Sequence, residues 1–163
     1  MQDRGTSVGG RVPEGRPVFV ALLLAGLAGA AVFEFIALVL APAVLGHPIV
    51  PARLVVNLGA ALTGTEWPML AGWIGHFAAG ILVFPLGYLA FLRLSGLRSW
   101  PASGAIWGVV LWLLAQGVFG PAAGGPFMSG FSAFMFVSLA VHLAYALAVA
   151  LALNLALARR RRP

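Results

Sequence analysis

The amino-acid sequence predicts an all-α fold, a polytopic membrane protein with four transmembrane helices. Of its 163 residues, 61% are hydrophobic and 9% are charged, and the mean hydropathy is +1.00. A soluble globular domain is about half apolar and about a quarter charged, so this composition excludes a soluble cytosolic domain. It also excludes a disordered chain, which would be poor in apolar residues. The lack of cysteine excludes disulfide bonds, thiolate metal sites and a cysteine nucleophile.

Four apolar stretches are long enough to cross a bilayer, which takes roughly 20 apolar residues in an α-helix. They are Pro17–Pro42, Met69–Leu92, Ser103–Gly120 and Gly130–Ala158. Prolines and glycines lie between them, and these residues typically end helices. Pro85 lies inside the second stretch, where we expect a kink, because proline lacks the N–H of a continuous helix.

The basic residues predict the orientation of the chain. All ten are arginines, and nine of them fall on one side of the spans, at Arg4, Arg11, Arg16, Arg93, Arg98 and 159–162. Only Arg53 falls on the other side. The positive-inside rule then places both termini and the loop between the second and third spans in the cytoplasm, as expected for a multi-pass membrane protein. Arginines beside spans are expected to contact the lipid bilayer, and not nucleic acid.

The chain divides into three parts on this basis. Residues 1–16 are expected to form a cytoplasmic N-terminal tail, residues 17–158 the four-helix transmembrane domain, and residues 159–163 a basic C-terminal tail. The first apolar run is about 25 residues long, which exceeds the core of a signal peptide. We therefore expect it to remain as a helix of the domain.

The first outer loop, residues 43–68, is predicted to contain a short amphipathic helix over Pro51–Leu62. One face of this segment carries apolar residues at helical spacing, namely Leu54, Val55, Leu58, Ala61 and Leu62. Proline at its start and Gly64 after its end are typical helix boundaries. We expect the helix to lie in the outer headgroup layer; an irregular loop is the alternative.

Two pairs of similar segments suggest a duplicated helical hairpin. His76–Val83 is similar to His142–Val149, and Ala41–Gly46 is similar to Ala115–Gly120. Two spans per unit would give both halves the same orientation, with the relating axis along the membrane normal. Chance similarity between helices rich in alanine, leucine and valine is the alternative.

Ionisable residues inside membrane helices are costly, so each one is a candidate functional residue. The predicted spans contain three of them, Glu34, His76 and His142. Gln116 and Tyr145 are polar companions in the third and fourth spans. The sequence therefore predicts one buried polar cluster of these five side chains in the interior of the bundle.

Small residues indicate which helix faces pack together, because close backbone approach supplies much of the packing energy in lipid. His76 shares a helix face with Gly72 and Gly80. We expect these two glycines, together with Gly26 and Gly108, to lie at helix–helix contacts. The polar residues on the same faces would then point into the bundle and away from lipid.

Four functions remain open for the cluster. It can be a hydrogen-bond network that locks the bundle and needs no cofactor. It can be a bis-histidine haem b site in which His76 and His142 are the axial ligands. A divalent metal site is the third possibility, with Glu34 as an additional ligand. The fourth is translocation of protons or ions along the cluster.

No catalytic set of residues is recognisable, so we expect a non-enzymatic protein. The predicted spans leave little mass outside the membrane and offer many small-residue faces for contacts. These features favour an accessory or scaffold subunit of a larger respiratory or photosynthetic membrane complex, with other integral membrane subunits as partners. A haem- or metal-binding bundle is the alternative, and proton or ion translocation is a lesser one.

Three short motifs add a resemblance to this interpretation. They are Trp73–Gly80 in the second span, Gly104–Gly108 with Trp112 in the third, and His142–Tyr145 in the fourth. From Pro51 onward the chain resembles a group of small bacterial inner-membrane proteins of unknown function, the YagU-like proteins. The resemblance implies a four-helix bacterial membrane protein and brings no catalytic residues. The chain departs from the pattern at Ala146, where glycine is expected.

Overall fold

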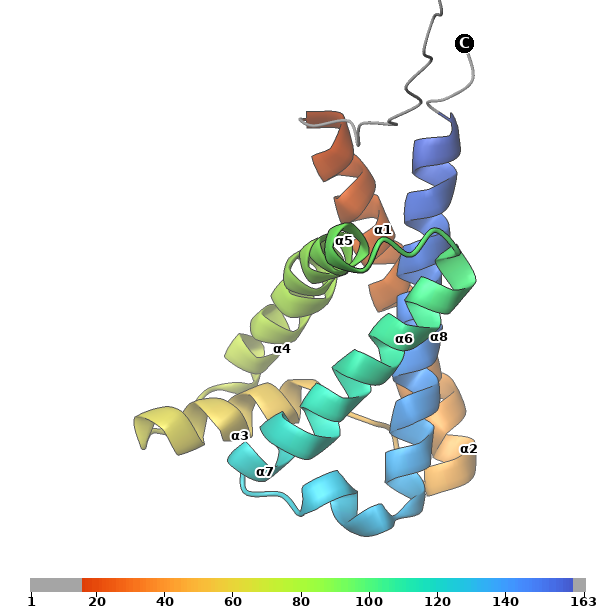
Figure 1. Cartoon of the computed structure of the whole chain (residues 1–163). Helices are drawn as coiled ribbons and strands as arrows, with labels where there is room; N and C mark the ends of the chain where they lie inside the picture. The colour runs from red at the N-terminus through yellow and green to blue at the C-terminus, as the bar shows by residue number, and fades with distance from the viewer. Residues whose placement is uncertain (1–15, 160–163) are drawn as a thin grey trace, which may run out of the picture.

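The computed structural model describes residues 16–159, and every regular element in that range is a helix (Figure 1). In chain order the elements are α1 (Arg16–Phe35), η1 (Ile36–Leu40), α2 (Ala41–Leu45), α3 (Ala52–Thr63), α4 (Met69–Ala78), η2 (Ala79–Val83), α5 (Phe84–Ser95), α6 (Trp100–Leu113), η3 (Leu114–Phe119), α7 (Gly120–Ala122), η4 (Phe127–Phe131) and α8 (Ala133–Arg159). Apart from Arg16 and Arg159, the two predicted tails lie outside the described residues.

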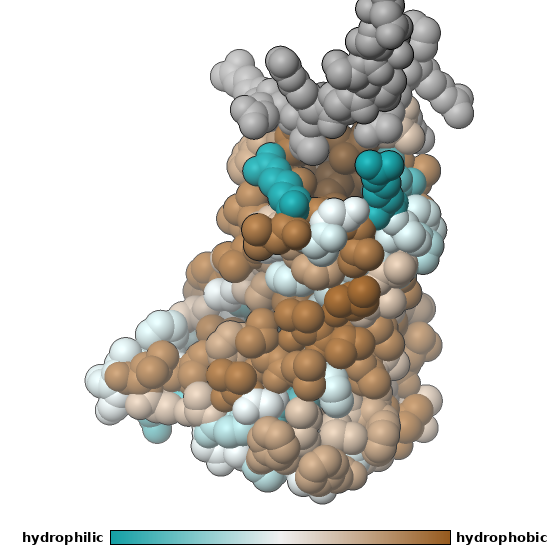
Figure 2. Space-filling view, in the orientation of Figure 1, coloured by the Kyte–Doolittle hydropathy of each residue, from teal (hydrophilic) through white to brown (hydrophobic). Residues whose placement is uncertain are grey.

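Four continuous helical stretches of the described chain are long and apolar enough to cross a membrane. They are Val18–Leu45, Met69–Ser95, Trp100–Ala122 and Ala133–Ala158. The face of the bundle in Figure 2 is largely apolar. Among the exposed apolar residues of the bundle, Leu24, Leu70 and Ile74 are each more than half exposed. Such a surface is compatible with lipid, whereas in water it would favour aggregation. The predicted all-α fold with four transmembrane helices is confirmed.

α8 is the central helix of the bundle, because it packs along both α1 and α6. The second span, α4–η2–α5, reaches the others mainly through η2, which lies against α1. In Figure 1, α4 and α6 both lean away from α8 toward α3, which lies across one end of the bundle. We call this end the α3 end, and the opposite end, where α1 begins and α8 finishes, the terminal end.

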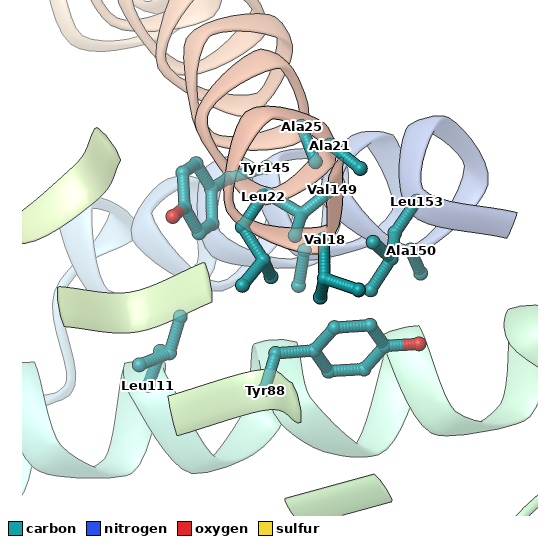
Figure 3. Close-up of a cluster of buried hydrophobic side chains, with 11 residues drawn as sticks. Val18, Ala21, Leu22, Ala25, Tyr88, Leu111, Tyr145, Val149, Ala150 and Leu153 are labelled. Carbon is teal, nitrogen blue, oxygen red and sulfur yellow. The ribbon is translucent and has the colours of Figure 1, made fainter. Parts of the chain in front are cut away.

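The hydrophobic core lies where α1, α5, α6 and α8 meet (Figure 3). It consists of Val18, Ala21, Leu22, Ala25, Tyr88, Leu111, Tyr145, Ala146, Val149, Ala150 and Leu153. Small residues on α1 and α8 let these two helices approach each other, and larger side chains fill the space toward α5 and α6. The packed core joins all four spans.

Glycines hold three of the helix contacts at close range. A Cβ at Gly26 on α1 would collide with the backbone of Ile81 in η2. A Cβ at Gly108 on α6 would lie 2.9 Å from the Cα of Leu143 on α8, and one at Gly72 would lie 2.5 Å from the carbonyl oxygen of Ala52. Gly80 differs, because the nearest atom to its Cβ would be 4.0 Å away. Gly80 therefore does not occupy a tight helix contact.

Each of the first three spans changes from α-helix to π-helix shortly before a proline. The segments η1, η2 and η3 end two residues before Pro42, Pro85 and Pro121, respectively. Prolines and π-helical turns are the usual causes of interruption in long helices. In the second span the π-helical segment η2 precedes Pro85, and the kink expected at this proline stays a prediction.

The π-helical register leaves one backbone carbonyl before each proline without a helical donor. In η2 the N–H of Phe84 donates to Ala79, five residues back. The next carbonyl in this register is that of Gly80, and it faces Pro85, which has no N–H. The hydroxyl of Tyr145 donates to this carbonyl at 2.6 Å. In the first span, the N–H of Ile49 donates in the same way to Ala37 at 2.9 Å.

Five predicted span boundaries are wrong. The second span ends at Ser95 and not at Leu92, and the third begins at Trp100 and not at Ser103. The first and third spans do not end at Pro42 and Gly120; they continue to Leu45 and Ala122, since the π-helical segments accommodate the prolines that follow them. The fourth span begins at Ala133 and not at Gly130, because residues 128–131 have positive φ angles that an α-helix cannot contain.

The predicted amphipathic helix of the first outer loop is present as α3. It begins at Ala52 and ends at Thr63, where Gly64 adopts a φ of 70°. α3 packs against α4 at two glycines: Gly72 faces Ala52 and Val56, and Gly75 faces Val55. α3 is therefore attached to the second span, while its location in a headgroup layer stays a prediction.

The two halves of the proposed duplication have different local structures. The segment 79–83 in the second span is π-helical, whereas the corresponding segment 145–149 in the fourth span lies within the α-helix α8. The predicted match of 41–46 with 115–120 likewise pairs α2 with part of η3. Duplication of the hairpin stays a prediction.

Candidate functional site

A cavity of about 770 Å³ lies inside the bundle toward the α3 end. Every span contributes to its walls, together with α3 and the loop that precedes α3. The polar side chains in the lining are His47, Arg53, His76, Gln116, Ser138, His142 and Tyr145. The rest of the lining is almost entirely apolar, with Phe33, Phe84 and Phe134 among its larger members. His47 and Arg53 are exposed, so they mark the rim of the cavity.

Glu34 and His76 form an ion-pair contact beside the cavity. The Oε1 atom of Glu34 on α1 lies 2.7 Å from Nε2 of His76 on α4. The two side chains are only 16% and 15% exposed, so the contact is strengthened by its low-dielectric surroundings. A carboxylate oxygen accepts, so Nε2 of His76 donates. The second carboxyl oxygen, Oε2, is buried and has no hydrogen-bond partner within the described residues.

His142 belongs to a different polar network. Its Nδ1 atom lies 2.7 Å from the backbone carbonyl oxygen of Ser138, one turn earlier on α8. The amide of Gln116 on η3 donates to the hydroxyl of Ser138 at 2.9 Å. Ser129 in η4 donates in turn to the side-chain oxygen of Gln116. This network connects the loop at the α3 end with the imidazole of His142.

Tyr145 occupies a third position on the cavity wall. Its hydroxyl donates to Gly80, as described above, and its ring packs at roughly right angles to Phe33 and Phe84. Phe33 also contacts both imidazoles, with ring centroids 5.3 Å from His76 and 5.6 Å from His142. The five predicted cluster residues thus surround one interior region but form three separate hydrogen-bonded groups.

The geometry of these groups bears on the predicted ligand sets. Within residues 16–159, no three side chains of the histidine, cysteine, aspartate or glutamate type are placed to hold one metal ion. Glu34, His76 and His142 are therefore not assembled as a three-ligand site. For a bis-histidine haem, Nε2 of His76 is already bound to Glu34, so this histidine would need to exchange that partner or bind through Nδ1.

Three features of the site, Ser129, Ser138 and the cavity, were not part of the predicted cluster. Ser129 lies outside the predicted cluster, and only the tertiary structure brings it to Gln116. The cavity itself has no signature in the sequence, because its walls come from all four spans and from α3. Ser138 could have been found, since it lies four residues before His142 and thus on the same helix face.

The family model described as "Family of unknown function (DUF6789)" matches residues 16–163, so the chain belongs to this family. No curated protein and no solved structure matches it. The likeness to the YagU-like proteins stays a prediction.

Proposed function

We propose that this member of a family of unknown function is a non-enzymatic membrane protein that binds an apolar small molecule in its interior cavity. One observation carries the proposal, the cavity of about 770 Å³ with its almost wholly apolar lining. We also propose a location in the inner membrane of a bacterium, which the resemblance to the YagU-like proteins implies, with both termini in the cytoplasm, which the arginine distribution predicts.

The size and chemistry of the cavity support this function. Small-molecule sites have volumes of roughly 300–1,000 Å³ and are lined mostly by apolar and aromatic side chains with a few polar groups. This cavity has aromatic walls from Phe33, Phe84 and Phe134, and two imidazoles as its main polar groups. If it stayed empty, its walls would lose the dispersion contacts that a packed interior provides. An apolar ligand restores them.

Two adjacent alanines supply a matched test of ligand binding. Ala79 lines the cavity, whereas Ala78 is exposed on the outside of the same helix. We expect Ala79→Phe to lower binding by about tenfold or more. The larger side chain would occupy space that the bound ligand fills, and adding volume to filled space costs roughly 1–3 kcal/mol. Ala78→Phe should leave binding unchanged. Native mass spectrometry of protein released from the membranes in which it was expressed measures the bound small molecule directly.

The proposal fails if the wild-type protein carries no small molecule, or if Ala79→Phe carries as much as Ala78→Phe. Because Ala79→Phe could disturb the fold, Ala115→Phe provides a second test from the opposite wall, on η3. A thermal unfolding curve for each variant separates loss of the cavity from loss of the fold.

A haem is the second candidate ligand, and one observation favours it. The Nδ1 atom of His142 is held by a backbone carbonyl, which is the usual arrangement of a histidine that binds a metal through Nε2. The structure thus supports one axial ligand and leaves His76 paired with Glu34. Haem binding predicts a Soret absorption band in the purified protein that disappears in His142→Ala.

We also propose that the bundle serves as an accessory or scaffold subunit of a larger respiratory or photosynthetic membrane complex. Most of the described chain is membrane-length helix, which leaves the lateral helix faces as its main surface for partners. Copurification of other integral membrane chains in mild detergent would support this role, and a monodisperse monomer would contradict it.

Proton or ion translocation through Glu34, His76 and His142 remains the lesser alternative, and it requires a flux into proteoliposomes that Glu34→Gln abolishes.

A further inference from the structure

We propose that the ligand of the cavity is an apolar molecule with a hydroxyl group, and that this hydroxyl donates a hydrogen bond to Nε2 of His142. The inference rests on the proposed function and adds the chemical class of the ligand to it. Three observations carry it: the hydrogen bond at Nδ1 of His142, the position of the ring on the cavity wall, and the pairing of the neighbouring polar groups.

The hydrogen bond at Nδ1 determines the tautomer of His142. Its partner at 2.7 Å is the backbone carbonyl oxygen of Ser138, which can only accept. Nδ1 must therefore carry the proton. In a neutral imidazole the other nitrogen is then an acceptor, so Nε2 presents a lone pair. No side-chain substitution or change of ligand removes the carbonyl that holds this tautomer.

The lone pair of Nε2 is available to a molecule in the cavity. His142 is among the residues that line the cavity. Nδ1 is bonded to the backbone of α8, so Nε2 lies on the side of the ring away from that backbone. Within residues 16–159, no hydrogen bond engages Nε2, and it is not among the fully enclosed polar atoms that lack a partner. It is an unpaired acceptor that a ligand can reach.

Most of the other interior polar groups have partners. Gln116 and Ser138 bond to each other, and Tyr145 donates to Gly80. Nε2 of His76 bonds to Glu34 and its Nδ1 has no partner within the described residues, but no backbone carbonyl fixes the tautomer of this imidazole as Ser138 does for His142. Oε2 of Glu34 is also unpaired, but Glu34 is not part of the cavity lining. His142 is therefore the side chain best placed to select a ligand.

A lone acceptor in an apolar cavity favours a ligand that brings a donor. An alcohol or phenol supplies an O–H and pairs the nitrogen. An ether or a ketone of similar shape brings only acceptors, so Nε2 would be left facing another lone pair. Sites built to hydrogen-bond a hydroxyl reject analogues without it, since their buried polar group is then unpaired. We expect a preference for the alcohol of about tenfold.

A pair of isoprenoid probes tests this preference. The protein is incubated in detergent with an equimolar mixture of geranylgeraniol and its methyl ether, and the two complexes are counted by native mass spectrometry. The probes differ only by methylation of the hydroxyl oxygen, so the ratio of the complexes reports the donor and not the hydrocarbon chain. For the wild-type protein we expect about ten alcohol complexes for each ether complex.

His142→Phe is the decisive variant. It keeps an aromatic ring for the contact with Phe33 and removes the acceptor. We expect the ratio to fall to about one while the ether complex persists, which also shows that the cavity is intact. His142→Leu is a second variant if phenylalanine does not fit. His47→Leu is the matched control, because His47 lines the rim, has its Nδ1 3.2 Å from the carbonyl of Pro48, and is exposed to water. This control should keep the wild-type ratio.

The outcomes separate the inference from the function on which it rests. A ratio near one in the wild-type protein, with both probes bound, overturns the hydroxyl donor and leaves the apolar cavity site in place. An unchanged ratio in His142→Phe, or a ratio that falls in His47→Leu instead, also overturns the role of His142. Failure of the wild-type protein to bind either probe, together with the absence of any small molecule from its own membranes, overturns the proposed function itself.

Discussion

The hydroxyl of Tyr145 connects two helices at a position where the backbone needs a donor. Its partner, the carbonyl of Gly80, would face the N–H of residue 85 in the π-helical register, but residue 85 is a proline. In a bilayer no water is available to pair such a carbonyl. One tyrosine on α8 thereby compensates for one proline on α5.

Removal of this hydroxyl should therefore be costly. We expect Tyr145→Phe to lower the free energy of unfolding by on the order of 1 kcal/mol, because the Gly80 carbonyl is left buried and unpaired. Unfolding in mixed micelles with increasing SDS measures the change.

Tyr88→Phe is the matched control. Its hydroxyl bonds to Ser103 at 2.7 Å, and Ser103 keeps a second partner, the carbonyl of Trp100. The loss should be smaller than for Tyr145→Phe. Equal losses in the two variants would contradict the special role assigned to the Gly80 carbonyl.

At the scale of the elements, η2 is the segment through which the second span contacts the rest of the bundle. Gly26 on α1 lies against the backbone of Ile81 in η2, and Gly80 in η2 faces the cavity. The same short segment thus forms a tight contact on one side and part of the cavity wall on the other. A methyl group added at Gly26 and one added at Gly80 should therefore have different effects on stability.

We expect Gly26→Ala to destabilise the protein by roughly 1–3 kcal/mol, since its Cβ would collide with backbone atoms that cannot rotate away. Gly80→Ala should be close to neutral, because the nearest atom would be 4.0 Å from the new Cβ. Thermal unfolding of both variants in detergent checks the difference. A loss for Gly80→Ala as large as for Gly26→Ala would show that η2 is packed on both sides.

At the scale of the whole molecule, the four spans place the rim of the cavity and the turn between α5 and α6 at opposite ends. His47 and Arg53 lie at the α3 end, and Ser99 lies in the turn before α6. The arginine distribution predicts that the turn is cytoplasmic and that the rim faces the periplasm. A ligand would then enter from the periplasm or the outer leaflet.

The absence of cysteine makes this orientation simple to measure. In intact bacterial cells, a membrane-impermeant maleimide should label His47→Cys and leave Ser99→Cys unlabelled. Both positions are exposed, so both should react once the cells are permeabilised. Labelling of Ser99→Cys in intact cells would reverse the predicted topology.

Properties that depend on local composition could be predicted well from the sequence. The four spans and α3 follow from apolar runs of sufficient length and from helical spacing of apolar residues. The boundaries were predicted less well, because whether Pro42 ends a helix depends on the wider π-helical turn before it and on the N–H of Ile49, which replaces the missing donor.

The candidate site was predictable only as a set of residues. Glu34, His76, Gln116, His142 and Tyr145 stand out because polar side chains are rare in membrane helices. Their pairing could not be derived, since Glu34 and His76 are 42 residues apart and Tyr145 and Gly80 are 65 apart. Separations of this length are set by the packing of whole helices, which the periodicity of one helix does not specify.

The sequence by itself determined that this chain is a four-span helical membrane protein and which polar residues its interior contains, since hydropathy, length and residue type are properties of each segment alone. Only the tertiary structure decided that α4 and α6 lean away from α8, that the polar residues divide into three groups, and that a cavity with an unpaired acceptor at His142 lies between the spans. The reason is physical: the space between helices depends on how their glycine contacts and π-helical segments orient them, and this is a property of the assembled bundle.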